Sequence, residues 1–183
     1  VVVTIGLYFL WLRGLPLLVL GAAGVVLVLT YTRWITRSPL LCLLAPGMGF
    51  GPIMVLGTVI ALGASIDSTA LLASLVALLM VSELLLINQI PDAEADRAIG
   101  RRHLVITLGP EKAAHLVAGL LLASYGVIVA GVISGHLDMT GLIALAPLPA
   151  AIWISLRLPR VLAMPDQLNR VLGANVAVLL STL

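Results

Sequence analysis

Three side chains that could bind a metal ion recur at every fourth position near the middle of the chain: Asn88, Asp92 and Asp96. On a helix, residues at this spacing share one face, with neighbouring Cβ atoms about 6 Å apart. Two carboxylates in that arrangement can share one cation. An isolated D-x-x-x-D pair is also typical of a solvated helix start, so the spacing alone leaves both interpretations open.

Cations follow these carboxylates directly. Arg97, Arg101 and Arg102 come soon after Asp96 in the stretch "DRAIGRRH". Mg²⁺ binds through a few carboxylate oxygens together with waters and substrate phosphates, and guanidinium groups bind further phosphate oxygens in a forked geometry. The combination is typical of a metal-bridged diphosphate. Contact between the arginines and lipid headgroups is the competing interpretation.

Two more polar features lie close to apolar segments. Glu83 falls inside an apolar run, where an ionisable group is costly and usually faces a polar cavity. A proton-handling or acceptor-orienting group and a carboxyl kept neutral by burial are both open interpretations. The stretch "YTRWITRSP" places Tyr31, Trp34 and Arg37 together, which is typical of an interfacial belt with basic anchors.

Apolar segments must position these groups. The uninterrupted apolar runs are Val1 to Leu12, Leu15 to Tyr31, Leu40 to Gly63, Thr69 to Ile90, Ala113 to Ser134, Thr140 to Leu156, and Leu168 to Leu183. The first and last are shorter than the roughly 20 residues that cross a bilayer. The first also lacks the charged start and the cleavage site of a signal peptide, so it is interpreted as the end of a longer helix.

The basic residues alternate between the connections that join these runs. Of the ten Lys and Arg residues, only Arg13 lies in an odd-numbered connection. The others lie in or beside the even-numbered ones: Arg33, Arg37, Arg97, Arg101, Arg102, Lys112, Arg157, Arg160 and Arg170. Seven crossings that obey the positive-inside rule would give this pattern, with the even connections facing the cytoplasm.

Composition excludes other classes of protein. The chain has 183 residues, of which 61% are hydrophobic and only 10% are charged, against roughly 25% charged in a soluble domain. Aromatic residues are too few for barrel girdles or for a nucleic-acid stacking surface. The single cysteine, Cys42, is interpreted as a buried apolar residue. The sequence predicts one all-α, polytopic transmembrane helix bundle over residues 1–183.

Glycine and proline give two further expectations. Glycines at 47, 49 and 51 would let a neighbouring helix or a lipid chain approach the backbone closely. Pro91 should end the helix of the fourth run and begin a new one, because proline cannot donate the helical hydrogen bond but suits the first helical position.

The stretch "NQIPDAEADRAIGRRHLVITLG" resembles the second aspartate-rich motif of the UbiA superfamily of intramembrane prenyltransferases. The matched features are N-xxx-D-xxx-D, the following Gly100 with two arginines, and "LVITLG" at 104 to 109. The wording is most similar to members that prenylate 1,4-dihydroxy-2-naphthoate in menaquinone synthesis. Members of the superfamily have nine crossings and two such motifs. The resemblance therefore implies that the chain lacks the N-terminal helices and the first motif, and that this fragment alone is inactive.

The resemblance also implies a site and a reaction. Asp92 and Asp96 would be catalytic residues that bind Mg²⁺ on the diphosphate of an isoprenyl donor. The implied substrate-binding residues are Asn88, Arg101, Arg102, Tyr31 and Arg37. The polyprenyl group would pass to an aromatic acceptor in the cell (inner) membrane, with the site facing the cytoplasm and no nucleic-acid partner. The alternatives are another acceptor (4-hydroxybenzoate, haem, chlorophyllide, homogentisate or a glycerol-phosphate lipid) and a non-enzymatic transporter or lipid-binding protein.

Overall fold

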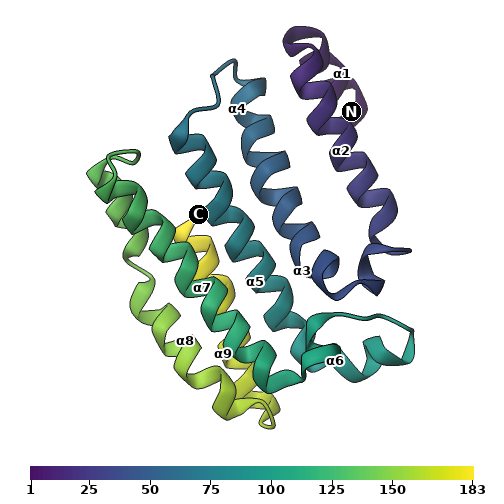
Figure 1. Ribbon diagram of the computed structural model, residues 1–183, viewed down its shortest axis with the longest axis vertical. Helices are drawn as coiled ribbons and strands as arrows, with labels where there is room; N and C mark the ends of the chain where they lie inside the picture. The colour runs from purple at the N-terminus through teal and green to yellow at the C-terminus, as the bar shows by residue number, and fades with distance from the viewer.

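The structure is a computed structural model that describes residues 1–183, apart from the side chain of Val2. Every regular element in this range is helical (Figure 1). The elements are α1 (Val2–Arg13), α2 (Leu15–Tyr31), η1 (Ile35–Arg37), α3 (Pro39–Met48), η2 (Gly49–Leu56), α4 (Gly57–Ala61), α5 (Ser68–Ala98), α6 (Leu104–Leu108), α7 (Pro110–Ile133), η3 (Met139–Leu145), α8 (Leu148–Val161) and α9 (Pro165–Thr182).

The helices run up and down beside one another, as Figure 1 shows. Four helical segments in the described residues are long and apolar enough to cross a membrane: Pro39–Ala61, Ser68–Ala98, Pro110–Ile133 and Met139–Val161. The first of these joins α3, η2 and α4, and the last joins η3 and α8. With the shorter apolar helices α1 and α2, they confirm the predicted all-α polytopic bundle.

Helix α5 lies at the centre of the bundle. It packs against α3 and η2 on one side and against α7 and α9 on the other. Met80, Leu86 and Ile87 of α5 are completely buried, and they belong to one core cluster with side chains of α7, α8 and α9. By contrast, no residue of α2 is buried among the described side chains. The N-terminal helices therefore lie at the edge of the bundle, next to α3, η2 and α4.

Two of the three clustered glycines explain how closely α3 and η2 approach α5. A Cβ atom at Gly47 would collide with the Ser82 hydroxyl, and one at Gly51 would collide with the backbone of Ser74. Gly49 differs from both. Its ideal Cβ position lies 3.5 Å from Leu27 Cδ2 of α2 and meets no other described atom within 4 Å. The first two glycines serve helix packing, whereas Gly49 faces α2.

The prediction that a new helix begins at Pro91 is wrong. Helix α5 continues without interruption for 31 residues, from Ser68 to Ala98. Ile90 before the proline and Asp96 after it are both buried against neighbouring elements, so the turns on each side are held by tertiary packing that outweighs one lost hydrogen bond. Asn88, Asp92 and Asp96 consequently stay on one rigid helix.

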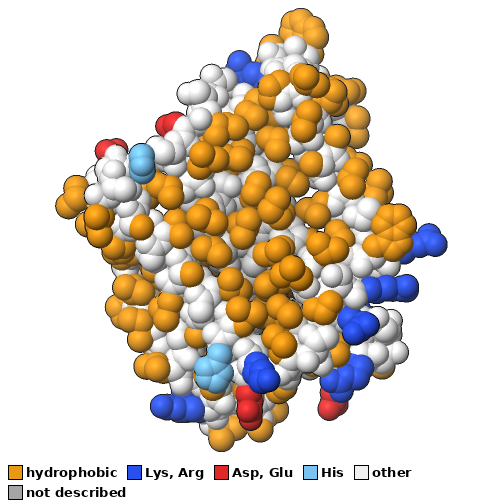
Figure 2. Space-filling model, in the orientation of Figure 1, with side chains coloured by type: hydrophobic (Ala, Val, Ile, Leu, Met, Phe, Trp, Pro, Cys, Tyr) orange, Lys and Arg blue, Asp and Glu red, His pale blue; other side chains and the backbone are white. Residues whose placement is uncertain are grey.

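The alternating course of the helices separates the charges. We call the end of the bundle that carries the connections at 32–38, 99–109 and 162–164 the charged end. Figure 2 shows most of the visible Lys and Arg side chains at that lower end. At the opposite end, the Asp67 carboxylate caps α5 by accepting a 2.8 Å hydrogen bond from the Ala70 amide. Arg13 Nε donates to Ala61 O there, at 2.9 Å.

Candidate functional site at the charged end

The chain reverses direction directly after α5. Gly100 adopts a φ of 80°, a left-handed conformation that suits glycine. The Arg101 amide then donates a 3.0 Å hydrogen bond back to the Asp96 carbonyl. The turn therefore brings the side chains that follow Gly100 back over the last turns of α5, where the predicted metal-binding carboxylates lie.

Two side chains of this turn lie against the Asp96 carboxylate, one at each oxygen. Its Oδ1 accepts a hydrogen bond from Arg101 Nη1 at 2.9 Å, and its Oδ2 lies 3.2 Å from His103 Nε2. The contact with the imidazole is electrostatic, because the ring nitrogen is not aligned for a hydrogen bond. Asp96 is only 7% exposed, so its carboxylate has a fixed position at the edge of the interior.

His103 is the most deeply buried polar side chain of this turn, at 1% exposure. Burial lowers the pKa of His103 below its ordinary value, while the nearby Asp96 and Asp92 carboxylates oppose that shift. From the sequence, His103 was counted with Arg97, Arg101 and Arg102 among the cations that follow the carboxylates, but it was given no role of its own in the site. Its position after the arginine pair was the one available signal.

Asn88 and Asp92 lie one and two helical turns before Asp96 and are both exposed. The Asn88 amide donates to the Leu84 carbonyl at 2.8 Å. The Asp92 carboxylate is close enough to His103 to interact with its charge. The predicted face therefore exists on α5, with one carboxylate clamped at the interior edge and one free to meet a ligand from outside.

The connection at 32–38 meets the connection at 99–109 at the charged end. The Arg102 amide donates a 2.9 Å hydrogen bond to the carbonyl of Thr36, which is buried in η1. The Tyr31 hydroxyl lies within electrostatic range of Arg101 and Asp96. The side chains of Arg37 and Arg102 are exposed at the same end of the bundle. We call Asp96 with its neighbours Arg101 and His103 the Asp96 clamp. Tyr31 lies within electrostatic range of this clamp, and Arg37 and Arg102 are exposed at the same end of the bundle.

A buried hydrogen bond joins α5 to α3 near the charged end. Gln89 Nε2, about two helical turns before Asp96, donates to the Cys42 sulfur at 3.3 Å. This contact between distant parts of the chain has no signal in the sequence. Cys42 is 2% exposed, in agreement with its interpretation as a buried small residue.

Glu83 is enclosed in the interior, away from the clamp. It is fully buried, and its Oε2 accepts a 3.0 Å hydrogen bond from Asn175 Nδ2 of α9. Glu83 Oε1 and Asn175 Oδ1 have no further partner among the described residues. Of the two open interpretations, the geometry favours the carboxyl kept neutral by burial, since a protonated oxygen could donate to the amide oxygen.

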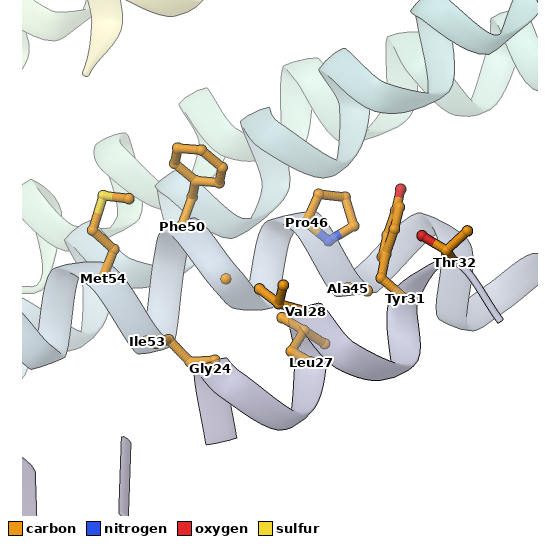
Figure 3. Close-up of a pocket in the computed structure, with 11 residues that line it drawn as sticks. Gly24, Leu27, Val28, Tyr31, Thr32, Ala45, Pro46, Phe50, Ile53 and Met54 are labelled. Carbon is orange, nitrogen blue, oxygen red and sulfur yellow. The ribbon is translucent and has the colours of Figure 1, made fainter. Parts of the chain in front are cut away.

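An apolar cavity of about 500 Å³ lies between α2 and the α3–η2 segment (Figure 3). Tyr31 and Thr32 line it at the charged end, and aliphatic side chains, Phe50 and Met54 line the rest. Tyr31 also lies within electrostatic range of Arg101 and Asp96, so one end of the cavity lies toward the clamp. The site can therefore receive a molecule with one charged and one apolar part.

The donor atoms suit Mg²⁺ only if the ligand completes the coordination. No three His, Cys, Asp or Glu side chains are gathered to hold an ion by themselves among the residues with described side chains. Two carboxylates on one helix face are nevertheless the kind of donor that Mg²⁺ takes when waters and substrate phosphates supply the remaining oxygens. The residues fit a metal that arrives with a diphosphate.

Comparison with known proteins gives one result at the family level. No curated protein and no solved structure matches the chain. Residues 1–165 match the UbiA prenyltransferase family. This match covers most of the chain and includes Asp96, the turn that contacts it and the helices that line the cavity. The chain belongs to the UbiA prenyltransferase family, whose members are membrane prenyltransferases.

Proposed function

We propose that the protein transfers a polyprenyl group from an isoprenyl diphosphate to an aromatic acceptor in a Mg²⁺-dependent reaction at the charged end. The observation that carries this proposal is the Asp96 carboxylate clamped by Arg101 and His103, on the same helix face as the exposed Asp92 and beside an apolar cavity. An ion pair that served stability alone would need neither the second carboxylate nor the cavity.

In this proposal Asp92 and Asp96 hold the metal, and Asn88 supports the same face of α5. When bound, Mg²⁺ would neutralise negative charge on the diphosphate. The protein contributes rigidity, because a carboxylate whose rotamer is fixed by neighbouring groups presents its oxygens in one geometry. Asp96 has such neighbours in Arg101 and His103.

Cationic and phenolic groups stabilise the departing diphosphate. Arg101 is oriented by its bond to Asp96 and keeps other N–H donors for phosphate oxygens. Tyr31, at the end of α2, and the exposed Arg37 and Arg102 lie at the same end of the bundle and are proposed to contact the diphosphate as well. Charge that develops on the leaving group would meet donors that are already in place.

The reaction exchanges one bond for another at the allylic carbon. The bond between this carbon and the diphosphate oxygen breaks, and the electron-rich carbon of the acceptor forms the new bond and then loses its proton. Water would compete for the allylic cation, so an apolar surrounding protects the reaction. The lining of the cavity between α2 and α3–η2 provides such a surrounding beside the clamp.

For the acceptor we propose 1,4-dihydroxy-2-naphthoate, in menaquinone or related quinone synthesis. The support is that residues 91–109 resemble the same stretch of family members that use this acceptor. Acceptors of other members, such as 4-hydroxybenzoate, haem, chlorophyllide or a glycerol-phosphate lipid, are the alternatives. A non-enzymatic transport or lipid-binding role is the alternative of a different class.

We further propose that the charged end faces the cytoplasm from the cell (inner) membrane. The support is the separation of the basic residues, of which only Arg13 lies at the opposite end.

An acceptor screen tests the proposed function. The complete protein that carries this sequence is incubated with Mg²⁺, a long prenyl diphosphate and each acceptor, and products are identified by mass. We expect prenylated naphthoate that disappears when Mg²⁺ is chelated. A different prenylated product would change the acceptor and keep the reaction. No product with any acceptor would reject the transferase assignment and favour a transport or lipid-binding role.

A further inference from the structure

We propose that a cleft on the opposite side of α5 from the Asp96 clamp binds a small hydroxylated aromatic acid. We call it the α5–α9 cleft, and define it by three residues at its base and four at its rim: Ile90, Val105 and Leu168, and Glu94, Arg97, Glu111 and Asn169. The proposed acceptor belongs to the same chemical class, but the cleft is a second site, and binding there does not depend on the transfer reaction.

Helix α5 presents different residues to the cleft and to the clamp. Ile90, Glu94 and Arg97 line the cleft, and their spacing of four and three places them on one helix face. Asp92 is two residues from both Ile90 and Glu94, which places it roughly 160–200° around the helix from them. Neither Asp92 nor Asp96 lines the cleft among the described residues. A ligand in the cleft is therefore separated from the predicted metal-binding face by α5 itself.

The base of the cleft is apolar and belongs to the core of the bundle. Ile90 of α5, Val105 of α6 and Leu168 of α9 are all buried members of the core cluster. The cleft has a volume of about 970 Å³, at the upper end of the roughly 300–1,000 Å³ of small-molecule sites. A rigid aromatic ring can bury one face on such a base and loses little conformational freedom when it binds.

Polar groups from three helices surround this base. Glu94 and Arg97 come from α5, Glu111 from α7 and Asn169 from α9, and all four are exposed. Among the side chains that the structure describes, the salt bridges are confined to Asp96 and its neighbours. Neither carboxylate of the rim is therefore paired with Arg97. These groups are available to a ligand that reaches across the cleft.

The charges of the rim favour a ligand with one carboxylate and neutral hydroxyl groups. Arg97 can bind a carboxylate through two parallel N–H donors. Helices α7 and α9 both begin at the cleft, with Pro110 and Pro165 in its lining, so the positive ends of their dipoles also favour an anion (Figure 1). Glu94 and Glu111 repel a diphosphate or a phospholipid headgroup, but they accept hydrogen bonds from hydroxyl groups.

Binding of 3,5-dihydroxy-2-naphthoate to the complete protein tests the cleft without donor and without Mg²⁺. Titration calorimetry in detergent should show saturable binding to the wild type. Arg97→Gln should weaken it about tenfold or more, because the bound carboxylate loses its charged partner. Ala93→Leu should weaken it to a similar extent, because Ala93 lines the cleft from α5 and a larger side chain there takes the place of the ring.

Arg170→Gln and Ala98→Leu are the matched controls. Arg170 directly follows Asn169 and Ala98 is the last residue of α5; both are exposed, and neither lines the cleft. Both variants should bind the probe as the wild type does. Unfolding temperatures establish that all four variants are folded.

The hydroxyl groups are tested separately from the carboxylate. The wild type should bind 2-naphthoate, which lacks hydroxyls, about threefold or more weakly than the dihydroxy compound. This preference should disappear when Glu94→Ala and Glu111→Ala are combined, because the rim then has no carboxylate to accept their hydrogen bonds. A preference that survives the double substitution would reject the assigned role of the two glutamates.

Three results would overturn the site. One is the absence of saturable binding to the folded wild type, or unchanged binding in both Arg97→Gln and Ala93→Leu. Another is binding that is lost in Asp92→Asn and kept in the cleft variants, because it would place the acid on the metal-binding face. The third is tighter binding of 2-naphthylmethylamine, which would reverse the charge of the ligand. Because the probe is measured without donor or Mg²⁺, none of these results bears on prenyl transfer, which the acceptor screen tests.

Discussion

Helix α5 carries two buried carboxyl groups in very different surroundings. Asp96, near its end, contacts Arg101 and His103 in a turn at the charged end. Glu83, nearer the middle, is fully buried, and its side chain accepts a hydrogen bond from the amide of Asn175 in α9. One carboxylate is paired with a guanidinium and lies beside an imidazole, and the other is paired with a neutral amide in the core.

Burial alone therefore does not identify a functional carboxyl. A buried carboxylate with cationic partners at an opening can exchange those partners for a metal and a phosphate. A carboxyl that hydrogen-bonds an amide deep in the bundle has no such ligand to receive, and it holds two helices together.

Asp92→Asn and Asp96→Asn should remove Mg²⁺-dependent transfer. Either change keeps the side-chain shape but removes a charge that holds the metal, so we expect kcat/KM to fall at least about 100-fold. Product formation by the complete protein is measured with saturating Mg²⁺. Glu94→Gln is the matched control, because Glu94 is also exposed at the charged end but lines a different cavity, with Arg97 and Asn169.

Near-normal transfer by both aspartate variants would reject the metal assignment. A similar loss in Glu94→Gln would indicate a general effect of acidic charge at this end. Unfolding temperatures of all three variants should remain near that of the wild type, because each replacement is close in size to the original side chain.

His103→Leu should weaken transfer less than the aspartate variants do. His103 contacts Asp96 and is only 1% exposed, so we expect it to act by positioning the carboxylate, and its loss should lower activity about 10- to 100-fold. The apparent Mg²⁺ affinity should fall with it. His103→Gln places an amide nitrogen near the position of Nε2 and should recover most of both quantities.

A merely structural role for His103 would give a different result. It would lower the unfolding temperature of His103→Leu without changing the Mg²⁺ concentration needed for half-maximal activity. Equal behaviour of the Leu and Gln variants would also contradict positioning of Asp96.

Glu83→Ala should affect stability and leave the chemistry unchanged. The substitution leaves Asn175 without its partner in the interior, and we expect a loss of about 1–2 kcal/mol in unfolding free energy. Glu83→Gln keeps a hydrogen bond and should lose less. Denaturation in detergent or bilayers measures the change. A large loss of activity in a stably folded Glu83→Gln protein would restore a proton-handling role.

The smallest effect is expected for the cation farthest from the clamp. Arg13 donates to Ala61 O at the end of α4, and Arg13→Gln should reduce stability by about 0.3–1 kcal/mol. Prenyl transfer should not change.

Arg101→Gln, by contrast, removes the partner of Asp96 and should reduce transfer strongly. Equal activity of the two variants would contradict the functional difference between the two ends.

The fold could be predicted because bilayer crossings leave a strong local signal. The long apolar runs appear as the helices of the bundle, and alternating Lys and Arg residues mark one end. Pro91 is the instructive exception. Its local preference indicated a helix start, but packing of the flanking turns keeps α5 continuous. Sequence propensity is a weak guide where tertiary contacts hold both sides of a residue.

The candidate site was predictable only in its local part. Asn88, Asp92 and Asp96 were found from their helical spacing, and Arg101 from its position beside them. The roles assigned to these residues stay predictions. The contact of His103 with Asp96 depends on a reversal at Gly100, whose geometry no spacing rule specifies.

Contacts between residues far apart in the chain could not be predicted from the sequence either. The bond from the Arg102 amide to Thr36 and that from Gln89 to Cys42 each join residues from different helical hairpins. Gly49 could not be distinguished from its neighbouring glycines, because only the positions of α2 and α5 show which face each glycine presents.

Binding of a non-reactive isoprenyl diphosphate analogue gives the most direct test of the central claim. Titration calorimetry of the complete protein, with and without Mg²⁺, compares the wild type with Asp92→Asn and Glu83→Gln. The account predicts Mg²⁺-dependent binding in the wild type and in Glu83→Gln, and its loss in Asp92→Asn. Binding that is independent of Mg²⁺, or that survives in Asp92→Asn and fails in a folded Glu83→Gln, would contradict it.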